Sequence, residues 1–159
     1  MLMASTTLSI YLIICSFMVV LASASVLDVK EEPLSIGIEG IILCKSDPKT
    51  TPIKGSVARI TCLAVDQHGY ETAPFSVLSK PTDSKGYYFA ALYPHQLLHR
   101  NLKLADCRVF LQDSPFEACK VATDVNQGIT GAPISYRRLL HDKKMKLYSV
   151  PPFFFSNGY

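Results

Sequence analysis

Four cysteines spread over most of the chain place the strongest constraint on its fold. The sequence holds 5 cysteines, of which Cys15 lies in an apolar leader, leaving Cys44, Cys62, Cys107 and Cys119. In an oxidising compartment, an even number of cysteines predicts disulfides, and four cysteines allow three pairings that sequence alone cannot separate. A metal site is disfavoured because no Cys-x-x-Cys pair is present and the cysteines stand far from one another and from the histidines.

The leader, residues 1–24, has the pattern of a secretory signal peptide. Residues 8–21 are almost wholly apolar, and Ala22-Ser23-Ala24 offers the small residues that a signal peptidase requires. The apolar run is shorter than the roughly 20 residues that span a bilayer, so a cleaved signal is favoured over a membrane anchor. A short acidic lead at 25–34 and a single domain at 35–159 then remain, without a further membrane segment.

The stretch from Cys107 to Cys119 shows most clearly what kind of structure the cysteines connect. Cys107, Val109 and Leu111 point one way and Arg108, Phe110 and Gln112 the other, which is the period of a strand with one buried face. Asp113-Ser-Pro115 ends this strand because proline donates no ladder hydrogen bond and favours a turn.

Other short alternating runs are separated by turn residues. They predict strands at residues 36–44, 55–65, 71–79 and 87–92. Pro74 places the third of these at a sheet edge, residues 45–54 read as a loop, and residues 94–100 as one helical turn that begins at Pro94. Helical periodicity is otherwise almost absent, which predicts an all-β fold, a small antiparallel β-sandwich or barrel.

The segments around the cysteines, taken in order, resemble a known plant family. The matching pieces are Gly40-Ile-Ile-Leu-Cys44, Gly55-x-x-Ala-x-Ile-x-Cys62, Thr82-Asp-x-x-Gly86-Tyr87, Cys107-x-Val-x-Leu-x-x-Ser114-Pro115-x-x-x-Cys119, Gly128-Ile-Thr-Gly131 and Leu147-Tyr-Ser-Val-Pro-Pro-Phe153. This set is similar to the secreted proteins related to the major olive pollen allergen (Ole e I-like) and to the extensin-like cell-wall proteins.

The resemblance implies an all-β domain with nested disulfides, Cys44 to Cys119 and Cys62 to Cys107. Many relatives carry a third disulfide, which begins where this chain has Asp47, and here no cysteine follows Cys119. Both halves of that third bridge are therefore absent together. Relatives often also carry a proline-rich arm, whereas this chain has only 10 prolines, scattered along its length.

The sequence carries no pattern that predicts catalysis, a cofactor or a metal site. It has no nucleophile elbow, no phosphate loop and no recognisable carboxylate pair for glycoside cleavage. Among the 4 histidines, His95 and His99 would share one face of a helical turn. They lack a third ligand nearby, so surface positions are favoured over a metal pair.

Aromatic residues offer one candidate binding surface. Residues 87–89 and residues 153–155 are two aromatic runs that could stack against sugars, although alternate members of each run are expected to fill the core. Thr51-Pro52 and Ser114-Pro115 resemble sites for proline hydroxylation and O-glycan addition.

Basic residues near the C-terminus offer a second candidate binding surface. Five of them, against Asp142 alone, give five minus one, or +4, out of a formal net charge of +3 for the chain; they are Arg137, Arg138, Lys143, Lys144 and Lys146. If residues 142–150 are extended, Met145 and Leu147 anchor one face and leave Lys144, Lys146 and Tyr148 on the other. The predicted binding residues are therefore Arg137, Arg138, Lys144, Lys146 and Tyr148. The alternative is an ordinary solvated basic strand.

These features favour a secreted, non-enzymatic plant protein of the cell wall or apoplast, a role that rests on the resemblance. Its expected partner is an acidic wall polysaccharide such as pectin, or wall glycoproteins, acting during growth of walled cells such as pollen tubes or root hairs. A nucleic acid would fit the charge but not the compartment. The alternatives are a soluble ligand for a cell-surface receptor and, more weakly, a secreted hydrolase or inhibitor.

Overall fold

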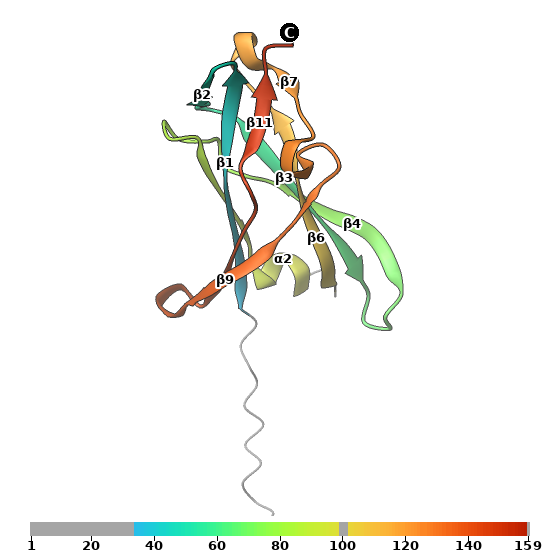
Figure 1. Ribbon diagram of the computed structural model, residues 1–159. Coiled ribbons are helices and arrows are strands. Elements are labelled where there is room, and N and C mark those ends of the chain that lie inside the picture. The colour runs from blue at the N-terminus through green and yellow to red at the C-terminus, as the bar shows by residue number, and fades with distance from the viewer. Residues whose placement is uncertain (1–33, 99–101, 159) are drawn as a thin grey trace, which may run out of the picture. The chain divides into compact units, whose positions relative to one another are not determined.

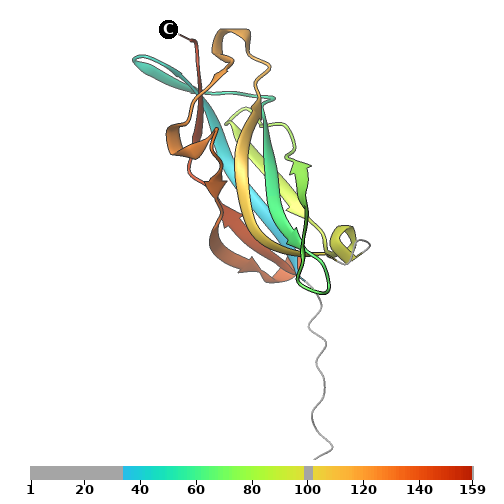
Figure 2. The same ribbon diagram turned by 90° about the vertical axis from the view of Figure 1, so that its right-hand side faces the viewer.

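The computed structural model describes residues 34–98 and 102–158, which form two packed β-sheets with one short helix (Figures 1 and 2). The expected signal peptide (1–24), the first nine residues of the acidic lead (25–33) and His99 lie outside the described residues. Within the described part, no helix is long and apolar enough to cross a membrane. The all-β prediction is confirmed.

The centre of the larger, seven-stranded sheet is β1 (Ser35–Ser46). One edge of β1 pairs antiparallel with β5 (Tyr87–Leu92) and β2 (Lys49–Pro52). Its other edge pairs with β10 (Met145–Ser149) and β11 (Phe153–Ser156), and β11 runs beside β1 in Figure 1. The sheet is completed by β9 (Ser135–Leu140) and β7 (Val121–Ala122) at its margins.

Two details of this sheet differ from the sequence prediction. The pairings of β1 with β10 and β11 are parallel, because the chain returns along β1 in the same direction after the β9–β10 hairpin. Pro151 and Pro152, which donate no ladder hydrogen bonds, divide this returning segment into two strands. Residues 45–54 are also not simply a loop, since β2 pairs back onto the end of β1 as a hairpin.

The second sheet has the order β4 (Glu71–Leu78), β3 (Val57–Val65), β6 (Lys103–Asp113) and β8 (Ala132–Pro133). As expected from Pro74, β4 lies at an edge of this sheet. Ile60 lies opposite Val109, and both are fully buried, as is Ala58, while Leu111 packs against the core. The strands predicted over 55–65 and from Cys107 onward, each with one buried face, are therefore confirmed.

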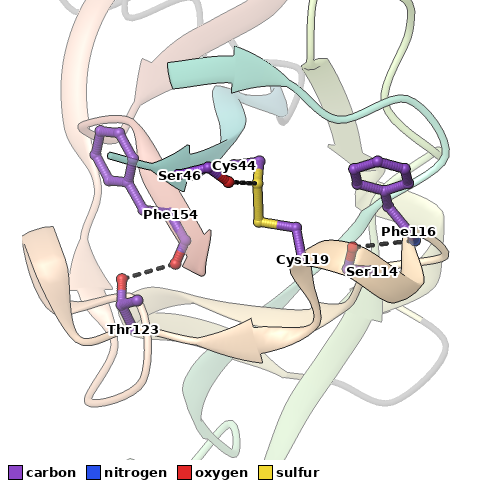
Figure 3. The surroundings of a disulfide bond; sticks show 7 residues. All are labelled: Cys44, Ser46, Ser114, Phe116, Cys119, Thr123 and Phe154. Carbon is purple, nitrogen blue, oxygen red and sulfur yellow. Dashed lines mark hydrogen bonds between the residues drawn. A yellow bond between two sulfur atoms is a disulfide. The ribbon is translucent and has the colours of Figure 1, made fainter. Parts of the chain in front are cut away.

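The two disulfides tie these sheets in different ways, and both confirm the nested pairing that the resemblance implied. Cys62 and Cys107 lie directly opposite each other in β3 and β6, so their bridge stays within the four-stranded sheet. Cys44 of β1 bonds to Cys119 of the short helix η1 (Glu117–Cys119), which lies in the connection from β6 to β7, so this bridge ties that connection to the seven-stranded sheet (Figure 3).

The surroundings of the Cys44–Cys119 disulfide are tightly packed. Ser114 is only 1% exposed, and its hydroxyl accepts a hydrogen bond from the Phe116 N–H at 3.3 Å (Figure 3). Its burial argues against an O-glycan at Ser114. On the other side, the Thr123 hydroxyl donates to the Phe154 carbonyl oxygen at 2.7 Å and holds the start of the segment after η1 against β11.

The remaining elements are short. The helical turn predicted from Pro94 is α2 (Pro94–Leu98), and the Gln96 side-chain oxygen accepts a hydrogen bond from the Tyr93 N–H at its start. Such a return contact to the residue before the helix satisfies a backbone donor that the helix itself leaves unpaired. Single turns η2 (Val125–Gln127) and η3 (His141–Lys143) lie in the connections.

Candidate functional site

The basic C-terminal segment forms a hairpin. Strands β9 and β10 are antiparallel neighbours, joined by η3 and by Lys144, whose φ of 46° lies in the left-handed region. The Lys144 N–H donates to the His141 carbonyl oxygen at 3.2 Å and closes this turn. Lys144 therefore lies in the turn and not, as the sequence predicted, on one face of an extended strand.

The predicted division of β10, with Met145 and Leu147 on one face and Lys146 and Tyr148 on the other, is confirmed, but the two faces point in the opposite directions. Met145 and Leu147 are buried, at 5% and 4% exposure, as expected of an anchor. They pair, however, with Ser35 and Gly37 of β1, whereas the core-facing residues of β1 are Ile36 and Ile38. The apolar pair therefore lies on the outer face of the seven-stranded sheet, the face that points away from the core.

Lys146 and Tyr148 consequently fall on the inner face of β10. They lie beside Ile36 and Ile38 of β1. Tyr148 is half-buried, packs against the core and meets Tyr136 edge-to-face with ring centroids 5.7 Å apart. Lys146 is exposed at the margin of that face. Tyr148 is thus a packing residue, and the predicted solvent-facing set of Lys144, Lys146 and Tyr148 is wrong as a geometrical group.

A β-bulge explains where the two arginines lie. Arg138 lies opposite Leu147 and Tyr136 lies opposite Tyr148, so Arg137 is an extra residue in β9. Adjacent strand residues normally point to opposite faces, but an inserted residue re-aims its side chain. The Arg137 Nε donates to the Ser149 hydroxyl at 2.6 Å, and both arginines line hollows on the outer face.

Those two hollows form what is called here the outer groove. The first has a volume of about 480 Å³, and its polar lining includes Arg138, Asp142 and Lys143. The second has a volume of about 260 Å³ and is lined by Arg137 and Ser149, among others. Both hollows share Glu39 and Tyr87. The groove therefore runs along the outer face on either side of this pair.

The floor and rim of the first hollow are largely apolar and aromatic. Phe89, Tyr93 and Met145 contribute to its lining. A Cβ atom at Gly37 would stand 2.6 Å from the Met145 sulfur and 3.0 Å from the Phe89 ring, so the absence of a side chain lets both close over β1. Tyr93 is 42% exposed and stacks on His95 with ring centroids 5.6 Å apart, which fixes the orientation of its ring.

Glu39 and Tyr87 are hydrogen-bonded to each other at the centre of the groove. The Tyr87 hydroxyl donates to the Glu39 Oε2 at 2.8 Å. Partial burial, then the hydrogen bond to Glu39 and the negative charges of Glu39 and Asp83, raise the pKa of Tyr87 to about 12. The hydroxyl consequently remains a donor at every physiological pH, and it fixes one oxygen of a carboxylate that has further acceptor positions.

The aromatic runs divide as alternation predicted. Tyr88 is 1% exposed and packs over Gly40 in the core, whereas Tyr87 and Phe89 face the outer groove. In the second run, Phe153 and Phe155 are buried and Phe154 is half-buried. Only the first run supplies side chains to the groove.

Sequence reasoning missed Glu39 and Tyr93 as site residues. Alternation along residues 36–44 puts Glu39 on the face opposite Ile36 and Ile38, but nothing in the sequence reveals that β5 and β10 flank it. The described residues include no group of three or more His, Cys, Asp or Glu side chains that could hold a metal ion. What the groove offers chemically is aromatic surface, two carboxylates of which that of Glu39 is fixed, two guanidinium groups and one ammonium group.

Comparisons with known proteins identify relatives in plants. No protein-family model matches the sequence. The seed and root hair protective protein of Arabidopsis thaliana is 46% identical over 124 residues, covering 78% of this chain and 74% of that protein. The crystal structure of the major plantain pollen allergen Pla l 1 is similar at a TM-score of 0.49 and 15% identity, covering 78% of this chain and 94% of the allergen.

Two longer relatives from Arabidopsis thaliana are proline-rich proteins. Proline-rich protein 1 is 42% identical over 123 residues, or 76% of this chain and 33% of that protein. Proline-rich protein 3 is 40% identical over 121 residues, or 75% of this chain and 37% of that protein. Since the match to the seed and root hair protective protein reaches 46% identity over 74% of its length, the chain belongs to the family of that plant protein.

Proposed function

We propose that this protein is a secreted, non-enzymatic plant cell-wall protein that binds acidic wall polysaccharide through the β9–β10 hairpin. The observation that carries the proposal is the bulge in β9, which directs Arg137 and Arg138 to one face beside Lys143. Two disulfides in the described domain suit an oxidising compartment. The names of the plant relatives, a protective protein and proline-rich proteins, are not names of enzymes.

The finer family assignment belongs to the same proposal. The ordered motifs that resemble the olive pollen allergen and extensin-like proteins support a place among secreted wall proteins, and the nested disulfides agree with that resemblance. A role in root hairs or seeds is supported by the name of one relative. Wall glycoproteins are the second class of partner that this setting would offer.

Charge explains why a polysaccharide with repeated carboxylates fits. The hairpin carries five basic residues against Asp142, a formal +4, while the whole chain carries +3. Each exposed ion pair contributes only about 0–1 kcal/mol, but a polymer can make several such contacts at once. De-esterified pectin supplies these carboxylates at regular intervals. Because exposed charges are screened beyond about 8 Å at physiological salt, the binding must weaken as salt rises.

Retention on immobilised polygalacturonate tests the proposal. The wild-type protein should bind and elute as NaCl is raised, and methyl-esterified pectin should retain it poorly. A variant with Arg137, Arg138, Lys144 and Lys146 all changed to Gln should elute at much lower salt. The matched control changes four exposed lysines outside the hairpin to Gln, and should stay close to wild type; these are Lys45, Lys49, Lys80 and Lys85.

Two results would count against the proposal. Equal retention of the two fourfold variants would show that net charge alone governs binding and that the hairpin has no special part. A wild-type protein that is not retained, and that washes freely from intact cell walls without added salt, would favour the alternative of a soluble extracellular ligand.

A further inference from the structure

We propose that the outer groove recognises the sugar rings of that same polysaccharide, so that binding is selective for a uronide chain over other polyanions. This inference rests on the proposed function, because it assigns a specific role to the face beside the basic hairpin. In it, a pyranose ring packs on the aromatic rim, its hydroxyls donate to Glu39, and its carboxylate meets Arg138.

The shape of the groove suits a piece of a polymer. Its two hollows, of about 480 and 260 Å³, meet at the Glu39–Tyr87 pair. Pockets that bind small ligands have volumes of about 300–1,000 Å³, so the first hollow can hold a sugar unit or two while the chain continues into the second. A groove with a hollow on each side of its central pair can follow an extended chain.

Aromatic side chains provide the apolar part of the recognition. The C–H faces of a pyranose ring are apolar, so they pack well against the flat face of an aromatic ring. Tyr87 and Tyr93 are 38% and 42% exposed and line the first hollow. Stacking on His95 holds the Tyr93 ring in place before any ligand arrives, which reduces the entropy lost on binding.

Polar groups that still have unused hydrogen-bonding capacity provide the rest. An ionised carboxylate has about four acceptor positions, and among the described residues the Glu39 side chain accepts only from Tyr87. Arg138 makes no ion pair with a described carboxylate, and its planar guanidinium matches a uronate carboxylate in a two-pronged contact. The groove thus has an acceptor for sugar hydroxyls close to a donor for sugar acids.

A proline-rich peptide is the other extended polymer that aromatic grooves bind. The half-buried Glu39 argues against it here. Proline rings carry no hydrogen-bond donor, so covering this carboxylate with them would remove its water without replacing the lost hydrogen bonds. A saccharide supplies hydroxyl donors at the same place.

The decisive variant is Glu39→Gln, because two explanations predict opposite signs for it. If the face attracted polyanions by charge alone, removal of a negative charge would strengthen binding. If Glu39 accepts hydrogen bonds from sugar hydroxyls, the same change should weaken the affinity for tri-galacturonate about tenfold, which is the loss expected for hydrogen bonds to a charged group. Glu71→Gln on β4 is the matched control and should leave this affinity unchanged or slightly higher.

A second pair of variants keeps the test independent of any folding defect at β1. Tyr93→Ala removes an exposed ring from the groove and should weaken tri-galacturonate binding severalfold, while Tyr70→Ala removes an exposed ring elsewhere and should not. Far-UV circular dichroism and non-reducing peptide mapping would confirm that each variant retains the fold. Affinities are measured by calorimetry at fixed salt.

Polyacrylate and oligoproline serve as comparison probes. Wild type should prefer polygalacturonate over polyacrylate of similar charge density. Glu39→Gln should abolish this preference, because it weakens polygalacturonate retention while polyacrylate retention stays the same or rises. Equal binding of both polyanions, unchanged or strengthened for both by Glu39→Gln, would overturn this inference and leave the proposed function standing. Tight binding of oligoproline would overturn it in favour of a peptide. No binding to either polyanion would overturn both proposals.

Discussion

The outer faces of the two sheets differ in how far their polar side chains are engaged with one another. On the four-stranded sheet, the Arg59 Nε donates to Gln112 at 3.0 Å and its guanidinium lies 4.9 Å from the Phe110 ring centroid. The hydroxyls of Thr61 and Ser76 pair at 2.9 Å on the same face. On the seven-stranded sheet, by contrast, Arg138 lines an open hollow and has no ion-pair partner among the described residues.

This difference separates a face that stabilises the fold from one that can serve a ligand. Cross-strand side-chain pairs contribute to sheet stability, and they use up the hydrogen-bonding capacity of the residues involved. A groove whose polar groups have unused hydrogen-bonding capacity can form hydrogen bonds with another molecule. The proposed binding role is therefore assigned to the seven-stranded sheet, with the four-stranded sheet as its support.

The largest expected effects come from the disulfides that hold the two sheets. Cys44→Ala with Cys119→Ala should lower the free energy of unfolding by about 4.5 kcal/mol, and Cys62→Ala with Cys107→Ala by about 4.0 kcal/mol. These values follow from the chain entropy of loops with sequence separations of 75 and 45. Urea denaturation followed by circular dichroism measures both. A clearly larger loss for the bridge within the four-stranded sheet would contradict this order.

Substituting one arginine on each outer face tests this difference between the sheets directly. The expected effects are smaller than those of the disulfides. Arg59→Gln should lower the free energy of unfolding by about 1 kcal/mol, because it removes an exposed cation–π contact and a side-chain hydrogen bond. Its retention on polygalacturonate should not change. Arg138→Gln should shift stability by less than about 0.5 kcal/mol and yet weaken retention. If both variants lose stability and neither loses retention, the proposed division between the faces is wrong.

The smallest expected effect concerns the alkaline stability of the groove. Partial burial and the Glu39 carboxylate raise the pKa of Tyr87 from its ordinary value of 10.0 to about 12, so the folded state holds this proton to higher pH than the unfolded state does. Stability should therefore fall as pH rises from about 10 to about 12, where the unfolded state binds fewer protons. Tyr87→Phe should flatten this part of the pH–stability curve, as measured by urea denaturation. An unchanged slope would contradict the assigned environment of Tyr87.

Local patterns in the sequence were sufficient to predict most strands. Alternation located the strand of Ile60 and its face, and Pro74 placed β4 at an edge, because these features depend on residues close together in the chain. The pairing of the cysteines came from the resemblance, since three pairings fit the same spacings. The parallel return of β10 and β11 along β1 could not be predicted, because strand periodicity is the same in parallel and antiparallel sheets.

The candidate site was harder to predict because a single inserted residue decides it. The bulge at Arg137 places two consecutive arginines on one face, and regular alternation had no means of foreseeing it. The prediction also had Met145 and Leu147 anchor the strand with the opposite face toward solvent, whereas they pack on the outer face with Phe89. An apolar residue in a strand shows that one face is covered, but not which neighbour covers it.

The parallel pairing of β1 also affects the order in which the protein can be assembled. β1 is the first strand of the described domain, whereas β10 and β11 follow its other strands in the chain, with Ile36 opposite Lys146. During synthesis, that edge of β1 has no partner until β10 and β11 emerge, although β3 and β6 are already complete. Contacts between residues so distant in sequence slow folding, and an unpaired strand edge invites aggregation. Chaperone protection of nascent β1 should therefore matter more for this protein than for a sandwich built from local hairpins.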